Sequence, residues 1–154
     1  MNQALETLAS SMGLAHPANE RLRLAFGHAC VLRVRQLLEE PAVIACMDVL
    51  GDYLQGTAER SALEAAQVEA LRLANQHAGS KSIDGCGHAA VSATYAVANA
   101  VNGKALAAAS YAAYATVYAG GGYAAVSERE AFEPEFAWQV RTLTALAGGL
   151  PASA

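Results

Sequence analysis

The sequence predicts an all-α protein, a compact single-domain bundle of about seven helices around a central pair of alanine-rich helices. Of the 154 residues, 37 are alanine, which has the highest helix propensity and a side chain small enough to let helices approach closely. Hydrophobic residues make up 54% of the chain and charged residues 16%, so there is ample apolar surface for a core. No segment alternates apolar and polar residues with the period of two that indicates a strand.

Residues 2–12 are expected to form a short helix at the periphery of the domain, within residues 1–15. Gly13 and then His16-Pro17 interrupt the helical pattern, because a residue before proline favours an extended backbone. We predict a long second helix from Asn19 to Glu40. Its apolar side has spacings of seven, three and four, set by Leu24, Val31, Val34 and Leu38.

Pro41 suits the first turn of a third helix, which is expected to end at Gly56. A fourth helix is predicted from Thr57 to His77, and a polar loop over residues 78–84 follows it. Each helix has an apolar stripe, formed by Val43, Met47, Leu50 and Leu54 in the third and by Leu63, Ala66, Ala70, Leu73 and His77 in the fourth.

Two helices over residues 86–101 and 104–119 are expected to form the centre of the bundle, because they are apolar on nearly every side. Gly120-Gly121-Gly122 is predicted to turn or kink the chain, since each glycine disfavours a helix by about 1 kcal/mol relative to alanine. A last helix is expected over residues 132–146, with Phe136, Val140 and Leu143 on one face, and residues 148–154 are expected to be a disordered tail.

A membrane hairpin is the alternative for the central segments, because residues 85–103 and 105–127 carry no charge and reach the length of a span. The second of these segments has few large aliphatic residues. Alanine, glycine and tyrosine insert poorly into a bilayer beside leucine or phenylalanine. The favoured interpretation is therefore the centre of a helical bundle, with no membrane partner.

No recognisable catalytic or cofactor motif occurs in the sequence. Three widely spaced cysteines and an N-terminus that does not resemble a secretory signal favour a reducing cytoplasm. Zinc needs more ligands than Cys86 and His88, and residues two apart in a helix, such as His28 and Cys30, point in different directions. We therefore predict no catalytic residue, no cofactor and no metal site. The alternative is a small helical metal-binding protein or enzyme that uses Cys86, His88 and His28.

Charge is concentrated in one part of the chain. The formal net charge of −4 argues against nucleic acid as a partner, because no basic field would hold its phosphates. Residues 39–69 carry seven acids and one base, Arg60. This region is expected to form either a solvated helix face or a surface that steers a basic protein partner. Its candidate partner-binding residues are Asp48, Asp52, Glu59 and Glu64.

A second acidic group, Glu128, Glu130, Glu133 and Glu135, lies near the start of the last helix, where negative charge favours the helix dipole. Tyr111, Tyr114 and Tyr118 are spaced three and four residues apart, so they form one stripe on the sixth helix. An apolar ring with a polar tip fits both a core boundary and a protein interface. The three tyrosines are therefore further candidate partner-binding residues.

The order of several motifs resembles that of a known family. The motifs are Leu24-Ala25-Phe26-Gly27-His28-Ala29-Cys30, Leu37-Leu38-Glu39-Glu40-Pro41, Gln55-Gly56, Gly87-His88-Ala89-Ala90-Val91-Ser92-Ala93-Thr94 and Ala109-Ser110-Tyr111-Ala112-Ala113-Tyr114-Ala115. Over residues 20–118 they are similar to the all-α immunity proteins found beside bacterial polymorphic toxins. The resemblance implies a cytoplasmic bacterial protein that binds and neutralises one cognate toxin domain, without chemistry of its own. It identifies neither the toxin nor a homo-oligomeric state.

Overall fold

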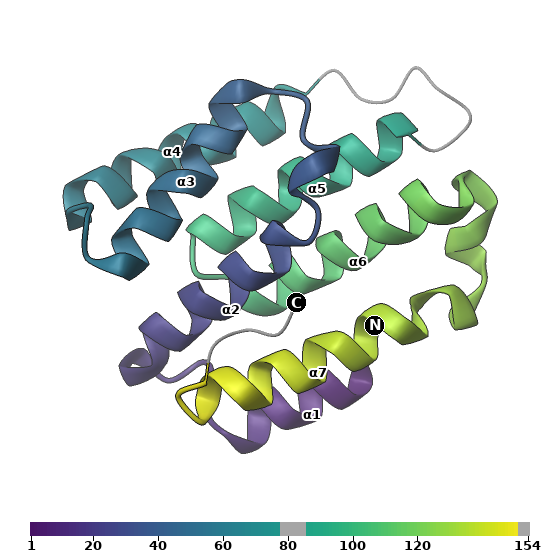
Figure 1. The fold of residues 1–154 in the computed structure, drawn as a ribbon, viewed down its shortest axis with the longest axis horizontal. Helices are drawn as coiled ribbons and strands as arrows, with labels where there is room; N and C mark the ends of the chain where they lie inside the picture. Colours follow the sequence, from purple (N-terminus) through teal and green to yellow (C-terminus); the bar gives the residue numbers. More distant parts are fainter. Residues whose placement is uncertain (78–85, 151–154) are drawn as a thin grey trace.

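The computed structural model describes residues 1–77 and 86–150. In these ranges the chain forms seven α-helices, four short 3₁₀ segments and no strand, which confirms the predicted all-α class (Figure 1). The helices are α1 (Gln3–Ser11), α2 (Glu20–Leu32), α3 (Pro41–Gln55), α4 (Arg60–Asn75), α5 (Cys86–Val101), α6 (Ala105–Gly121) and α7 (Glu133–Ala147). The 3₁₀ segments are Pro17–Asn19, Arg35–Leu37, Tyr123–Ser127 and Arg129–Phe132.

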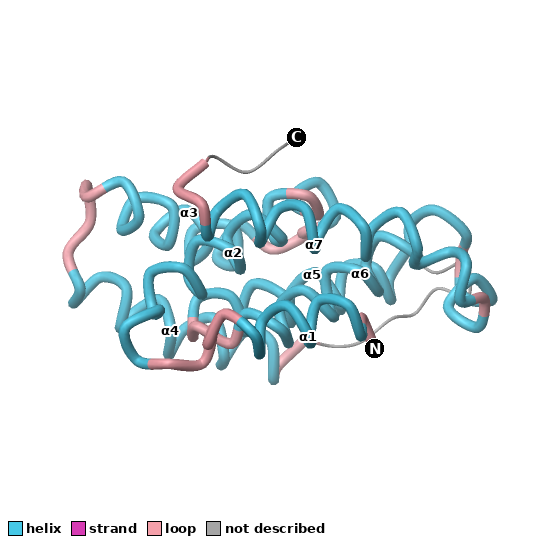
Figure 2. Tube along the Cα trace, turned by 90° about the horizontal axis from the view of Figure 1, so that it is seen from below, coloured by secondary structure: helices cyan, strands magenta, loops and turns pink. Residues whose placement is uncertain are grey.

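The α5–α6 pair forms the centre of the molecule, as the sequence predicts. α5 packs against α6, α2, α4 and α3, and α6 also contacts α2 and α7. In Figure 2, α2, α3 and α7 lie toward one side of the molecule and α1 and α4 toward the other, with α5 and α6 between them. Alanine permits this close packing, because it fills inward positions of both central helices and is fully buried at Ala93, Ala96, Ala108 and Ala112.

Two glycines let α2 approach its neighbours closely. A Cβ atom at Gly27 would lie 3.1 Å from the Cα and Cβ atoms of Ala100, so α2 meets α5 where position 27 has no side chain. A Cβ atom at Gly51 of α3 would lie 2.9 Å from Nε2 of His28. The absence of a side chain at position 51 therefore makes room for the imidazole between α2 and α3.

Two predicted helix boundaries are wrong. α2 ends at Leu32 rather than Glu40, and a 3₁₀ turn follows before the backbone becomes extended at Leu38 and Glu40, as the residue before Pro41 prefers. α4 begins at Arg60 rather than Thr57. The N–H and the Oγ1 hydroxyl of Thr57 both donate to the carbonyl oxygen of Asp52, at 2.9 and 3.1 Å, so Thr57 closes the end of α3.

The face that α7 buries also differs from the prediction. Leu143 is buried, but Phe136 and Val140 are only partly buried. The polar residues Glu135, Gln139 and Thr142 and the neighbouring Trp138 point into the protein instead. A hydrophobic pattern along one helix could not predict this, because the partners of Glu135 and Gln139 come from other segments, whereas the buried hydroxyl of Thr142 has no hydrogen-bond partner among the described residues.

Gln139 illustrates how such a buried polar group is satisfied. Its Nε2 amide donates to the carbonyl oxygen of Ala109 at 2.8 Å, and its Oε1 accepts from Nδ2 of Asn2 at 3.0 Å. Asn2 in turn caps α1, because its Oδ1 accepts from the backbone N–H of Leu5 at 3.2 Å. These bonds link α1, α6 and α7. The side-chain amides of Asn2 and Gln139 are therefore buried with hydrogen-bond partners from the protein in place of water.

The predicted turn after α6 occurs at Gly122, whose φ of 72° lies in the left-handed region. In the first part of the predicted tail, Gly149 also has a left-handed φ, of 81°, and the N–H of Leu150 donates to the carbonyl oxygen of Ala145 at 2.9 Å, which closes the end of α7. The remaining tail residues, 151–154, and the predicted loop over residues 78–84 lie outside the described residues. Among the residues that are described, no helix combines the length and the apolar character needed to cross a membrane.

Candidate functional site

All four candidate acids belong to one antiparallel hairpin, formed by α3, α4 and the turn between them (Figure 1). We call this unit the acidic hairpin. Asp48 lies in the middle of α3 and Asp52 one turn later near its end, Glu59 is the N-cap residue of α4, and Glu64 lies in its second turn. The four side chains are exposed. The turn at Gly56 brings Asp52 and Glu59 to the same end of the hairpin.

Two of these acids have arginine partners. Nη1 of Arg35 lies 2.7 Å from Oδ1 of Asp48, and Nε of Arg60 lies 3.8 Å from Oε1 of Glu64. Exposed ion pairs of this kind contribute about 0–1 kcal/mol to stability. Arg35 lies outside the acidic segment 39–69, so its partial neutralisation of the acidic surface could not be predicted from that segment.

Arg60 is also bonded to the start of α2. Its guanidinium donates to the carboxylate of Glu20 and, at 3.2 Å, to the hydroxyl of Tyr53. The hydrogen bond from Arg60 lowers the pKa of Glu20, and the bond to Glu20 raises the pKa of Arg60. Arg60 is therefore bound more closely to Glu20 than to Glu64, and the carboxylate of Glu64 stays accessible on the surface.

Asp52 and Glu59 form no ion pair with any described residue. Both lie beside the turn at Gly56, where the two bonds from Thr57 to Asp52 fix the backbone. A backbone fixed in this way limits how far the turn must reorganise on binding, which would reduce the entropic penalty of an interaction there. This turn is the strongest part of the candidate site.

The other end of the acidic hairpin is closer to neutral. Nε of Arg72 donates to Oε2 of Glu69 at 2.9 Å, and this bond lowers the pKa of Glu69. Glu40 contributes a further favourable electrostatic interaction with Arg72. Across the whole hairpin, the seven acids of residues 39–69 face three arginines, Arg35, Arg60 and Arg72. The predicted acidic excess is therefore present but smaller than the sequence segment alone indicates.

The structure gives the three candidate tyrosines different surroundings. Tyr111 is 38% exposed and stacks on Tyr95 of α5, with ring centroids 5.3 Å apart. Tyr118 stacks on His88 at 5.2 Å and lies 6.2 Å from Tyr114. Tyr114 meets Phe132 edge-on at 5.3 Å. Tyr111 is thus the most accessible of the three, and the sequence did not indicate its stacking partner.

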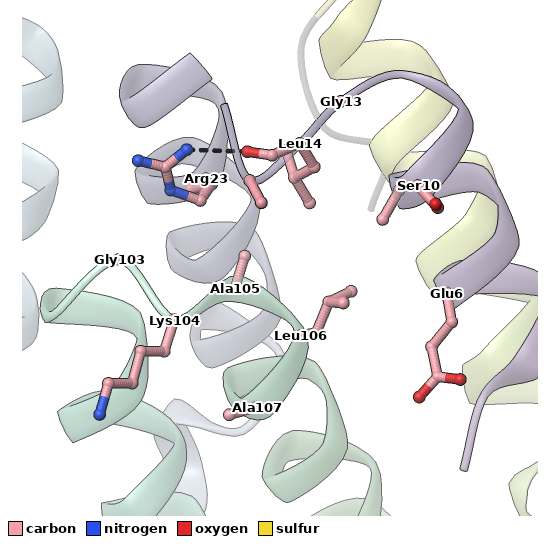
Figure 3. A pocket seen from close by; sticks show the side chains of 12 residues that line it. Glu6, Ser10, Gly13, Leu14, Arg23, Gly103, Lys104, Ala105, Leu106 and Ala107 are labelled. Atoms are coloured by element: carbon pink, nitrogen blue, oxygen red, sulfur yellow. Dashed lines mark hydrogen bonds between the residues drawn. The ribbon is translucent and has the colours of Figure 1, made fainter. Parts of the chain in front are cut away.

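A pocket of about 500 Å³ lies between α1 and the start of α6 (Figure 3). Ala105, Leu106 and Ala107 line one side and α1 lines the other, so most of its wall is apolar. Nη1 of Arg23 donates to the carbonyl oxygens of Leu14 and His16, at 2.8 and 2.7 Å. Because this guanidinium holds the connection between α1 and α2, its evident role is structural.

A partly buried ion pair joins the C-cap residue of α2 to α7, and no sequence pattern predicts it. Nε and Nη2 of Arg33 each donate to one oxygen of Glu135 at 2.8 Å, and the guanidinium lies 4.2 Å from the ring centroid of Trp138. Glu135 lies in the first turn of α7, as predicted, but it is only 4% exposed and its carboxylate is held by Arg33. Beside the pair, burial raises the pKa of Cys30 and keeps its thiol protonated.

The residues of the alternative metal site contact different parts of the protein. His28 lies against Gly51 of α3, whereas His88 stacks on Tyr118 of α6. The side chain of Cys86 lies outside the described residues. Within the described part of the chain, no three histidine, cysteine, aspartate or glutamate residues are grouped as a metal site requires.

Comparison of the chain with protein-family models, with curated proteins and with solved structures found no match. The function is therefore inferred from the fold and from the surface of the acidic hairpin.

Proposed function

We propose that this protein is an immunity protein that binds and neutralises one cognate bacterial toxin domain in the cytoplasm, without chemistry of its own. The observation that carries the proposal is the exposed acidic turn of the hairpin, where Asp52 and Glu59 form no ion pair with a described residue. The motif order that resembles the all-α immunity proteins supports the class of protein. The acidic hairpin supports the place where the partner binds.

The charge of the hairpin favours a toxin domain with a basic surface. Carboxylates gathered at one end of a molecule attract such a surface over a distance of about 8–10 Å at physiological salt. Complementary charge of this kind raises the association rate more than it lowers the dissociation rate. Asp52 and Glu59 are expected to contribute most, because Arg35 and Arg60 already offset the charge of Asp48 and Glu64.

Tyr111 is a second expected contact. Its ring is exposed yet held in place by stacking on Tyr95, and rigid aromatic side chains are frequent hot spots in protein interfaces. Truncation of Tyr111 to alanine should weaken toxin binding by about 2 kcal/mol if the ring enters a pocket of the partner.

Co-expression in bacteria tests the proposal. The toxin encoded beside the gene is expressed together with the wild-type protein or with a variant in which Asp48, Asp52, Glu59 and Glu64 are all changed to lysine. The wild type should protect the cells, and the four-residue variant should protect them poorly while keeping its helical content by circular dichroism. Absence of protection by the wild type would refute the immunity proposal.

A matched control separates this surface from net charge. Glu128→Lys/Glu130→Lys changes two exposed acids at the opposite end of the molecule in Figure 1, and Asp52→Lys/Glu59→Lys makes the same change in charge at the hairpin. The control should protect as the wild type does. Equal loss of protection in both double variants would mean that the hairpin is not the binding surface.

A further inference from the structure

The outward face of α4 exposes apolar side chains on an otherwise charged hairpin. Val68 is 73% exposed, Leu71 is 50% exposed, and Ala65 beside them is exposed as well. α4 packs on α3 and α5 through its opposite side and lies at the edge of the molecule (Figure 1). No described residue buries this face, so it is available to a partner.

The residues of this face are arranged symmetrically about Val68. An α-helix has 3.6 residues per turn, so positions three or four before and after a residue share its face. Glu64 lies four residues before Val68, and Arg72 lies four residues after it. Ala65 and Leu71 lie three before and three after. On either side of Val68, at equal distances along the helix, the face therefore carries an acid and a base, and closer to Val68 a small residue and a large one.

We propose that this face joins two copies of the chain in an antiparallel α4–α4 dimer whose two-fold axis passes at Val68. In such an interface, each residue meets the residue of the second copy that lies equally far on the other side of the axis. Glu64 then meets Arg72 of the second copy, and this pair forms twice. Ala65 meets Leu71 of the second copy, so large side chains fill the space beside small ones, and the two Val68 side chains meet at the axis.

Charge complementarity is the reason to assign a second copy as the occupant. Glu64 lies 3.8 Å from its intrachain partner Arg60, which leaves one side of the carboxylate open. Nη1 of Arg72 donates to Oε1 of Gln76 at 2.7 Å, and its Nε and Nη2 both donate to the carboxylate of Glu69, so Arg72 already has an acidic partner within its own chain. These bonds hold the guanidinium on the surface, where it can also face an incoming carboxylate. Glu64 and Arg72 carry opposite charges at equal distances from Val68, and an antiparallel second copy brings each of them opposite the other.

The dimer is expected to be weak. One face of a single helix gives an interface near the lower end of the range for specific complexes, so Kd should be on the order of 0.1–1 mM. The symmetric set includes Glu64 but not Asp52 or Glu59. The proposal therefore does not rest on toxin binding, and either one can fail without the other.

Sedimentation equilibrium of the full chain over a range of concentrations tests the dimer. The average mass should rise from the 15.9 kDa of one chain toward twice that value at about 1 mM protein. Val68→Glu should abolish the rise, because it places two carboxylates together on the axis. Leu32→Glu, a change at an exposed leucine of α2, should leave the rise unchanged.

Charge exchange tests the register. Glu64→Arg alone and Arg72→Glu alone should each weaken association about tenfold, and the double exchange should restore it. Residues 64 and 72 are eight positions apart in one helix and are not neighbours within a chain, so the restoration can arise only between chains. A monomer at every concentration, a double exchange that restores nothing, or equal loss in Leu32→Glu and Val68→Glu would overturn the proposal.

Discussion

The central α5–α6 pair and the acidic hairpin are both antiparallel pairs of helices of similar length, yet they use their surfaces in opposite ways. Residues 86–121 contain a single charged residue, Lys104, which is exposed in the connection between the two helices. The hairpin carries exposed charged residues on both helices, beside the apolar patch of Val68 and Leu71 on α4. A helix covered on every side must be apolar on every side, whereas a helix covered on one side can hold charge on the other. The first pair stabilises the fold, and the second is free to bind.

The ion pair between Arg33 and Glu135 differs from both regions, because the charged carboxylate of Glu135 is buried. Arg33→Met would leave the carboxylate of Glu135 buried without its partner and should reduce the free energy of unfolding by about 3 kcal/mol. Glu135→Gln should cost about 1 kcal/mol, because Arg33 is 34% exposed and can turn to water. Urea denaturation of the two variants measures the difference. If both variants lose the same free energy of unfolding, the burial of Glu135 does not account for the contribution of the ion pair to stability.

Overpacking the centre should come next in size. Ala96→Leu and Ala93→Leu each insert three carbon atoms at fully buried positions and should destabilise the protein by about 1–3 kcal/mol. Ala45→Leu makes the same change at an exposed position of α3 and should alter the free energy of unfolding by less than about 0.5 kcal/mol. Melting temperatures that fall equally in all three variants would contradict the distinction between the two helix pairs.

The smallest expected effect concerns pH. His28 lies between α2 and α3, and burial lowers its pKa in the folded protein, with Arg35 acting in the same direction and Asp48 opposing it. Below the ordinary pKa of 6.5, the unfolded chain takes up a proton that the folded chain resists. The free energy of unfolding should therefore fall as the pH drops from 7 toward the folded pKa, with a slope below the ~1.4 kcal/mol per pH unit that one full proton gives.

His28→Gln should remove this component of the slope. Urea denaturation at pH 7.0 and 5.5 compares the variant with the wild type. The same slope in both proteins would mean that another group is responsible.

The sequence predicts the bounds of a helix best where residues within or next to that helix alone determine where it begins and ends. The bounds of α3 follow from Pro41 and Gly56, and those of α5 from its continuous apolar run, and both agree with the structure. The end of α2 could not be predicted in this way. Val34 and Leu38 continue the apolar spacing and are buried, although the chain between them forms a 3₁₀ turn.

Pairings between distant segments explain the remaining differences at the candidate site. Arg35 lies outside the acidic segment but contacts Asp48, and Glu20 lies on α2 but binds Arg60. Glu135 has the same local pattern as its exposed acidic neighbours, and only Arg33 on another helix distinguishes it. The sequence locates the charges, whereas the packing of the helices decides which of them stay free.

The division between a central helix pair and a hairpin that we propose binds a toxin is tested most directly by an association rate constant, measured by stopped flow at low and high salt with a toxin domain encoded beside the gene. Asp52→Lys/Glu59→Lys should associate about tenfold or more slowly than the wild type at low salt, and the difference should shrink as salt screens the charges. Ala96→Leu should associate at the wild-type rate despite its lower stability. An unchanged association rate for the charge variant at low salt would contradict the proposed role of the hairpin.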